Sequence, residues 1–276
     1  MVAILELDTV SLSFGGLEVL REVSLDVVHQ GITALIGPNG AGKTALLNCI
    51  SGIYRPGAGR ILYQGQNLVG RSPERIAQLK IARSFQNLEL FPTLTVTENL
   101  LVARDRGFHG GVLAAAAFSG PVRRREIAAR EAVERVIDFF ELWPVRHMRA
   151  QDLPYGQQKI VGFARAMAME PAVLLLDEPG SGLTRDEKED LARFLLRLRH
   201  DWKISMLWIE HDLQMVMDLA ERVHVLHLGR RIASGTPDDV RRSSAVVEAY
   251  IGEEAARGAR PDEAGSEALP LRGQGG

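Results

Sequence analysis

A glycine-rich segment, Gly37-Pro38-Asn39-Gly40-Ala41-Gly42-Lys43-Thr44, constrains the fold of this chain more than any other feature. It matches the pattern G-x-x-x-x-G-K-[ST]. The apolar run 31–36 precedes it, and apolar residues recur at helical spacing after it. A plain glycine-rich turn is the alternative, but a strand before the loop and a helix after it are the context that phosphate binding requires. The segment therefore predicts an α/β fold with a phosphate-binding loop.

The residue types of this loop suit a nucleotide. Glycines let backbone N–H groups crowd around phosphate oxygens at the positive end of the following helix. Lys43 can reach the β- and γ-phosphates, and the Thr44 hydroxyl can ligate Mg²⁺. The loop alone does not separate a kinase, a GTPase and an ATPase.

Two carboxylates, Asp177 and Glu178, follow the apolar run 173–176. A run that is apolar on both faces is typical of a parallel strand covered by helices. The carboxyl end of such a strand faces the ligand crevice of an open α/β sheet. We therefore expect Asp177 to hold Mg²⁺ and Glu178 to polarise the water that attacks the γ-phosphate. An ordinary acidic turn at a strand end is the alternative.

Composition excludes several classes of protein. The 276 residues carry 33 Lys and Arg against 35 Asp and Glu, a net charge of −2, which argues against a general nucleic-acid binder. The single cysteine, Cys49, excludes an internal disulfide. The longest uncharged apolar run, 112–118, is far shorter than the roughly 20 residues that span a bilayer. Any membrane role must therefore come through a partner.

Periodicity and breaker residues divide the chain into one domain, 1–253, and a disordered tail, 254–276. The domain consists of a core, 1–87 and 169–253, and a mostly helical insert at about 88–168. Within the core we expect strands at 4–8, 23–28, 31–36, 61–63, 173–176 and 204–209, helices at 73–80, 186–198 and 212–220, and a hairpin around Gly229-Arg230.

Three further segments resemble those of the ATP-binding cassette (ABC) family. Leu153-Pro154-Tyr155-Gly156-Gln157-Gln158-Lys159 resembles the family's L-S-G-G-Q signature, Gln86 its Q-loop glutamine and His211 its switch histidine. Their order fits the family over residues 4–252. The resemblance implies an α/β P-loop NTPase fold: a mixed, mostly parallel sheet flanked by helices, an N-terminal antiparallel β subdomain and a helical insert. It also implies an ATPase that uses ATP and Mg²⁺.

The resemblance also implies roles for single residues. Phe14 would lie against the adenine ring, although it could be a core phenylalanine instead. Gln86 would touch Mg²⁺ and the attacking water, and His211 would bond the γ-phosphate and orient the water of Glu178; a loop amide and a structural histidine are the alternatives. The catalytic set is thus Glu178, His211 and Gln86, the metal ligands are Thr44, Gln86 and Asp177, and the nucleotide contacts are the loop 37–44, Phe14, Asp177, Tyr155, Gly156 and Gln157.

The signature departs from the family pattern. In the family, two cassettes pack head to tail, and the signature serine of one contacts the ATP of the other. Here Pro154 takes that position and offers neither a hydroxyl nor an N–H. Thr184 stands where the family often has an aspartate that couples the two sites. We therefore expect a heterodimer with a second cassette whose signature is intact. The alternative is that neighbouring N–H groups suffice.

Three features resemble the ATPases of branched-chain amino-acid importers: the segments 83–91 and 95–102, the extra segment 104–124, and the ending 246–252. The resemblance implies two transmembrane permease subunits, a substrate-binding protein contacted indirectly, and a place at the cytoplasmic face of the inner membrane. Importers of amides, urea or aromatic compounds and a lipid or lipopolysaccharide exporter are alternatives within the family. A soluble ABC-type ATPase and a small-molecule kinase lie outside the transporter class.

The stretch 86–98 is expected to form the groove that receives a short helix of the membrane subunit. Its apolar contacts would come from Leu88, Leu90, Phe91 and Leu94. The alternative is that these side chains pack inside the helical insert.

Overall fold

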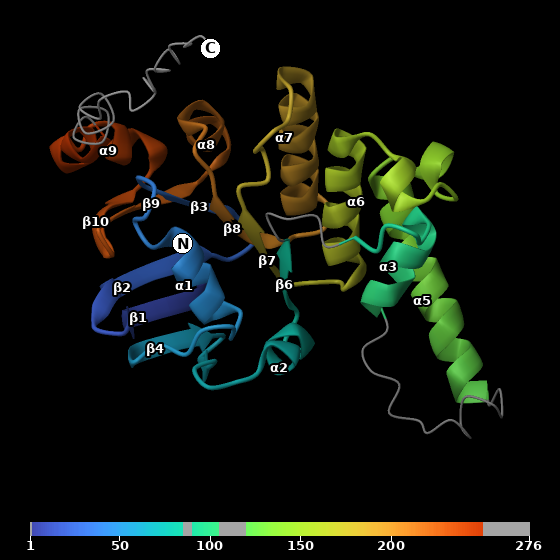
Figure 1. Cartoon of the computed structure of the whole chain (residues 1–276), viewed down its shortest axis with the longest axis horizontal. Coiled ribbons are helices and arrows are strands. Elements are labelled where there is room, and N and C mark those ends of the chain that lie inside the picture. Colours follow the sequence, from blue (N-terminus) through green and yellow to red (C-terminus); the bar gives the residue numbers. More distant parts are fainter. Residues whose placement is uncertain (1, 85–89, 105–119, 251–276) are drawn as a thin grey trace, which may run out of the picture.

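The computed structural model describes residues 2–84, 90–104 and 120–250. A six-stranded sheet forms the centre of the fold (Figure 1). All of its strand pairs are parallel except the pair formed by β9 and β10. In spatial order the sheet contains β10 (Arg230–Gly235), β9 (Arg222–His227), β3 (Ile32–Ile36), β8 (Ser205–Ile209), β7 (Val173–Asp177) and β6 (Ile81–Ser84).

A second, antiparallel sheet is formed by the N-terminal part of the chain. Its spatial order is β2 (Leu17–Val28), β1 (Ala3–Phe14), β4 (Ala58–Tyr63) and β5 (Gln66–Asn67). The first two strands are much longer than the predicted strands 4–8 and 23–28, because both continue to a tight turn at Gly15-Gly16. The mixed, mostly parallel sheet and the N-terminal antiparallel subdomain confirm the predicted fold class.

The central strands are buried on both faces, and alternate residues point into two separate cores. Val173 and Leu175 of β7 face a core shared with the antiparallel sheet and the helix α1 (Lys43–Ile50). Leu174 and Leu176 face the other core, which the remaining larger helices cover. The helix α1 therefore lies between the two sheets, where Cys49 is buried and its thiol pKa is raised to about 12 by desolvation.

Some of the helices that cover the second core come from the stretch predicted to be a helical insert, and these helices lie together at one side of the molecule (Figure 1). Among the described residues, no helix has both the length and the apolar character that crossing a bilayer needs. The other labelled helices are α2 (Pro73–Gln78), α3 (Val96–Arg104), α5 (Gly120–Phe139), α6 (Tyr155–Ala168), α7 (Arg185–His200), α8 (Leu213–Leu219) and α9 (Pro237–Arg241), with short 3₁₀ turns at Trp143–Val145 and Ala150–Asp152. The chain is also helical over residues 244–250.

Parallel pairing brings the carboxyl ends of four strands to one edge of the central sheet. Leu35 of β3 and Asp177 of β7 both pair with Ile209 of β8, and Ser84 of β6 pairs with Leu176. The phosphate loop follows β3, Asp177 ends β7 with Glu178 directly after it, and His211 follows β8. The topology therefore collects predicted site residues that are far apart in the sequence.

Two glycines of the antiparallel sheet offer a matched test of steric contact, because both have the positive φ that strains any other residue. Both have positive φ, +91° at Gly59 and +78° at Gly65. A Cβ at Gly59 would lie 2.5 Å from the carbonyl oxygen of Thr9, whereas a Cβ at Gly65 would meet open space. We predict that Gly65→Ala lowers the free energy of unfolding by about 1 kcal/mol, and that Gly59→Ala lowers it by about 3 kcal/mol. Urea unfolding of both variants measures the difference, and equal losses would contradict the steric reading.

Candidate active site

The phosphate loop joins β3 to α1, and its carbonyl oxygens surround the side chain of its own lysine. Lys43 is buried, and its Nζ donates hydrogen bonds to the carbonyl oxygens of Gly37 at 2.7 Å and Pro38 at 2.8 Å. At Gly37 φ is +147°, and a Cβ there would lie 2.0 Å from the carbonyl oxygen of Leu226 in β9. Only glycine fits that position. The loop is thus built tightly against the sheet edge, with its lysine held in place.

The first turn of α1 offers backbone N–H groups. Its N-cap, Gly42, has a left-handed conformation and makes no side-chain cap bond. No acidic residue lies in the first turn, and Thr44 is exposed there. The geometry suits an anion bound at the helix N-terminus with a hydroxyl beside it.

Asp177 ends β7 with a side chain that is only 2% exposed. Its Oδ2 accepts a hydrogen bond from Arg83 Nη2 at 2.8 Å. Its Oδ1 is buried and has no hydrogen-bond partner among the described residues. Because an unpartnered buried carboxylate oxygen is costly, Oδ1 is suited to accept a bond from water bound to a metal ion. The donor set of Asp177 and the Thr44 hydroxyl fits Mg²⁺, which prefers oxygen ligands and retains several waters.

Glu178 and His211 meet directly although they are 33 positions apart. His211 Nε2 lies 2.6 Å from Glu178 Oε1. Glu178 has φ of +49°, and its N–H donates to the carbonyl oxygen of Ile209 at 3.0 Å. A non-glycine residue in this conformation is strained, and such strain clusters at functional sites. The bend after β7 thus directs the Glu178 carboxylate toward His211, which lies two residues after the end of β8.

A buried acid behind this pair holds the two segments together. Glu210 Oε1 accepts from the N–H of His211 at 3.0 Å, and Oε2 accepts from the N–H of Gly180 at 3.1 Å. No sequence motif marks Glu210 as part of the site. A charged residue directly after the apolar run 206–209 was the available signal.

The signature residues Tyr155, Gly156 and Gln157 form the first turn of α6. A Cβ at Gly156 would lie 1.8 Å from Glu187 Oε1, so a larger residue would displace Glu187. The buried Lys159 donates from Nζ to the carbonyl oxygens of Pro179, at 3.2 Å, and Ser181. These contacts fasten the signature helix to the segment that follows the two carboxylates.

The two residues that depart from the family pattern, Pro154 and Thr184, both lie at helix N-termini. Pro154 is exposed and is the N-cap of α6, with no side-chain cap bond. Thr184 is the N-cap of α7: its Oγ1 accepts from the N–H of Glu187 at 3.4 Å, while Glu187 Oε2 accepts from the N–H of Thr184 at 2.8 Å. Thr184 thus begins a helix through a capping box.

Phe14 ends β1 with 48% of its surface exposed. Its ring packs edge-on against Tyr54, with centroids 5.1 Å apart. The alternative that Phe14 is a core phenylalanine is therefore wrong. Gln86, expected to contact the metal and the attacking water, lies outside the described residues.

The expected docking groove is described only in part, and Leu88 falls outside that part. Phe91 is 44% exposed and lies under the Arg165 guanidinium, whereas Leu90 is partly buried against the core. The fully buried Asn99 shapes this loop: its Oδ1 accepts from Phe91 N at 2.8 Å, and its Nδ2 donates to the carbonyl oxygens of Phe91, Leu94 and Thr95. Packing inside the insert therefore accounts for Leu90 but not for Phe91.

Comparison with known proteins identifies the family. A family model described as "ABC transporter" matches residues 20–181, and one described as "Branched-chain amino acid ATP-binding cassette transporter" matches residues 230–256. The chain is 37% identical to the high-affinity branched-chain amino acid transport ATP-binding proteins BraF of Pseudomonas aeruginosa and LivG of Escherichia coli K12. Each alignment covers 91% of this chain and 98% of the relative.

Solved structures agree with this assignment. The ADP conformation of MJ1267, an ATP-binding cassette of an ABC transporter, matches with a TM-score of 0.80 and 28% identity. The match covers 91% of this chain and 100% of the other. The chain therefore belongs to the ATP-binding protein family of ABC transporters, in the group that contains LivG and BraF.

Proposed function

We propose that this chain is the ATP-hydrolysing subunit of an importer for branched-chain or other hydrophobic amino acids. One observation carries the hydrolytic role: Glu178 and His211 meet 2.6 Å apart beside Asp177, at the sheet edge where the phosphate loop lies. The importer and its substrate class rest on the similarity to LivG and BraF.

In this proposal the phosphate loop binds ATP. The N–H groups at the start of α1 bind the phosphate oxygens, and Lys43 Nζ exchanges its carbonyl partners for the β- and γ-phosphates. Phe14, exposed at the end of β1, stacks on the adenine. Thr44, Asp177 and Gln86 would hold Mg²⁺, which supplies positive charge next to the phosphates.

Glu178 then accepts a hydrogen bond from the attacking water and polarises it. The water oxygen forms a bond to the γ-phosphorus while the bond to the β,γ-bridging oxygen breaks, which releases ADP and phosphate. His211 would bond the γ-phosphate and orient the water of Glu178, whose carboxylate its Nε2 contacts in this structure. The backbone conformation of Glu178, with φ of +49°, directs its side chain toward His211.

The second cassette in this proposal is a different chain. Pro154 offers neither a hydroxyl nor an N–H to an ATP held opposite, so this chain completes its partner's site poorly. Its own site is complete once a partner with an intact signature packs against it. A short helix of one of the two permease subunits then contacts the exposed Phe91 and its surroundings at the cytoplasmic face of the membrane, and the substrate-binding protein acts through the permeases.

We predict that Glu178→Gln lowers the rate of phosphate release at least about 100-fold, because a neutral amide oxygen polarises the attacking water far less than a carboxylate does. ATP affinity should change less than about twofold, since the phosphate loop is untouched. His211→Ala should lower the rate as well. His200→Ala is the matched control, because His200 is an exposed histidine at the end of α7. A folded Glu178→Gln protein that hydrolyses ATP at the wild-type rate would refute the assignment.

We predict that Pro154→Ser raises ATP hydrolysis by the purified homodimer about tenfold, because one added hydrogen bond to a charged group is worth about 1.5 kcal/mol. Pro144→Ser, at an exposed proline of the helical insert, should have no effect. If the homodimer hydrolyses ATP rapidly and Pro154→Ser leaves that rate unchanged, neighbouring N–H groups suffice and the heterodimer argument fails.

We predict that Phe91→Gln abolishes co-purification with the permease subunits and substrate uptake, because it removes an exposed apolar contact. ATP binding by the isolated chain should be retained. Leu196→Gln, at an exposed leucine of α7, is the matched control. Leu90 is a poorer choice because it packs against the core. Unchanged uptake with Phe91→Gln would refute the docking assignment.

A further inference from the structure

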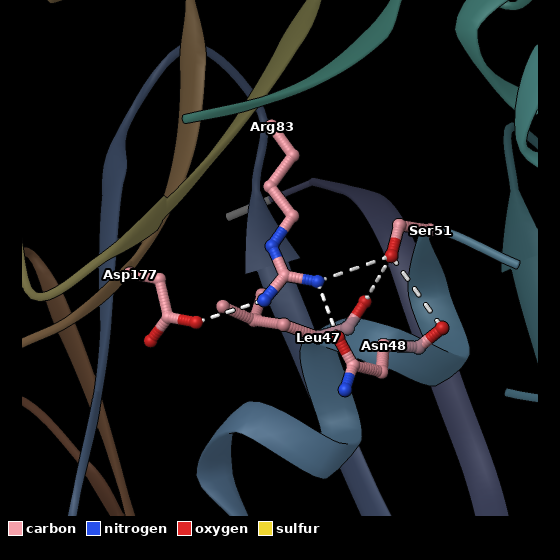
Figure 2. Close-up of polar contacts among 5 residues, drawn as sticks. All are labelled: Leu47, Asn48, Ser51, Arg83 and Asp177. Atoms are coloured by element: carbon pink, nitrogen blue, oxygen red, sulfur yellow. Dashed lines mark hydrogen bonds and ion pairs between the residues drawn. The ribbon is translucent and has the colours of Figure 1, made fainter. Parts of the chain in front are cut away.

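Arg83 lies on β6, shortly before the segment that contains Gln86, and its side chain crosses to the neighbouring strand β7. Its Nη2 donates to Asp177 Oδ2 at 2.8 Å, and only 8% of the arginine side chain is exposed (Figure 2). The proposed mechanism uses Asp177 but gives Arg83 no role. A buried ion pair on the proposed magnesium ligand therefore needs its own explanation.

The other arm of the guanidinium is fixed to a different element. Arg83 Nη1 donates to Asn48 Oδ1 at 2.5 Å and lies 3.4 Å from Ser51 Oγ, at the end of α1 (Figure 2). Ser51 Oγ in turn donates to the Leu47 carbonyl oxygen at 2.8 Å. The guanidinium thus connects β7 to the helix that begins at the phosphate loop. Its plane is set by α1, so the direction of its bond to Asp177 is set as well.

The two oxygens of Asp177 are not equivalent. Oδ2 is occupied by Arg83, whereas Oδ1 is buried without a hydrogen-bond partner among the described residues. A carboxylate fixed through one oxygen cannot rotate freely, so it offers the other oxygen in a constant direction. Groups that orient a metal-binding carboxylate in this way raise the affinity of the metal.

We propose that Arg83 is a positioning residue that fixes the Asp177 carboxylate relative to the phosphate loop and leaves Oδ1 as the oxygen offered to magnesium. This inference rests on the proposed nucleotide site. It explains why the position holds arginine: a planar fork reaches two acceptors on different elements at once, whereas a lysine ammonium is a single point charge.

The test measures metal binding rather than hydrolysis. Full-length chain is loaded with ADP, and binding of Mn²⁺ is followed by the loss of its free electron paramagnetic resonance signal. We expect Arg83→Gln to weaken Mn²⁺ binding about 10- to 100-fold, the usual loss when the partner of a metal ligand is removed. ADP affinity in EDTA should change less than about twofold, because the phosphate loop is intact. Arg83→Lys should retain part of the Mn²⁺ affinity.

Two controls separate positioning from general damage. Arg146→Gln removes an arginine that pairs with Glu134 in the helical insert, and it should change neither affinity. Asp177→Asn should weaken Mn²⁺ binding, and adding Arg83→Gln to it should cause no further loss, because both changes act on one carboxylate. If Arg83→Gln does not fold, Arg83→Lys, alone and combined with Asp177→Asn, provides the same comparison.

The outcomes are distinct. Unchanged Mn²⁺ affinity in the Arg83 variants, with a loss in Asp177→Asn, would overturn the positioning role alone. An equal loss of ADP affinity in EDTA, or additive losses in the double variant, would also overturn it in favour of a purely structural role. Unchanged Mn²⁺ affinity in Asp177→Asn would instead refute the proposed metal site.

Discussion

The parallel register of β6, β7, β8 and β3 is the constraint on which the rest of the site depends. Because Leu35 and Asp177 share the partner Ile209, the phosphate loop and the carboxylates leave the sheet at the same level. A shift by one residue would turn Asp177 to the other face of the sheet and exchange the two cores. The alternating burial of β7 in two apolar clusters resists that shift. Packing therefore sets the position of the site.

The buried charged side chains near this edge of the sheet have polar partners that compensate their charge. Asp177 is paired with Arg83, and Glu210 accepts two backbone N–H bonds. Lys159 satisfies its ammonium with backbone carbonyls, and burial lowers its pKa while the nearby acids Glu210, Glu178 and Glu187 oppose that shift. Removing one partner from such a buried arrangement leaves an uncompensated charge. The same contacts link the signature helix to the carboxylate segment, so the two are mechanically connected.

Motifs with a local mechanism were predictable from the sequence. The phosphate loop, the strand that ends at Asp177 and the fold class follow from glycine placement and apolar runs. The strands β1 and β2 are longer than predicted. Register shifts between them interrupt the regular alternation of apolar and polar residues, so the apolar pattern ends before the strands do. The contacts of Arg83 and Asn99 could not be predicted, because the partner of Arg83 is 94 positions away and Asn99 satisfies the backbone of a loop. Only the fold defines such residues.

A crystal structure of the wild-type chain with Mg²⁺ and a slowly hydrolysed ATP analogue would show directly where the magnesium ion binds. The predicted result is a metal ion beside the Thr44 hydroxyl, with a water-bridged contact to Asp177 Oδ1 and with the Arg83 bond to Oδ2 intact. A metal ion held by other carboxylates, or an Arg83 side chain that has left Asp177, would contradict it.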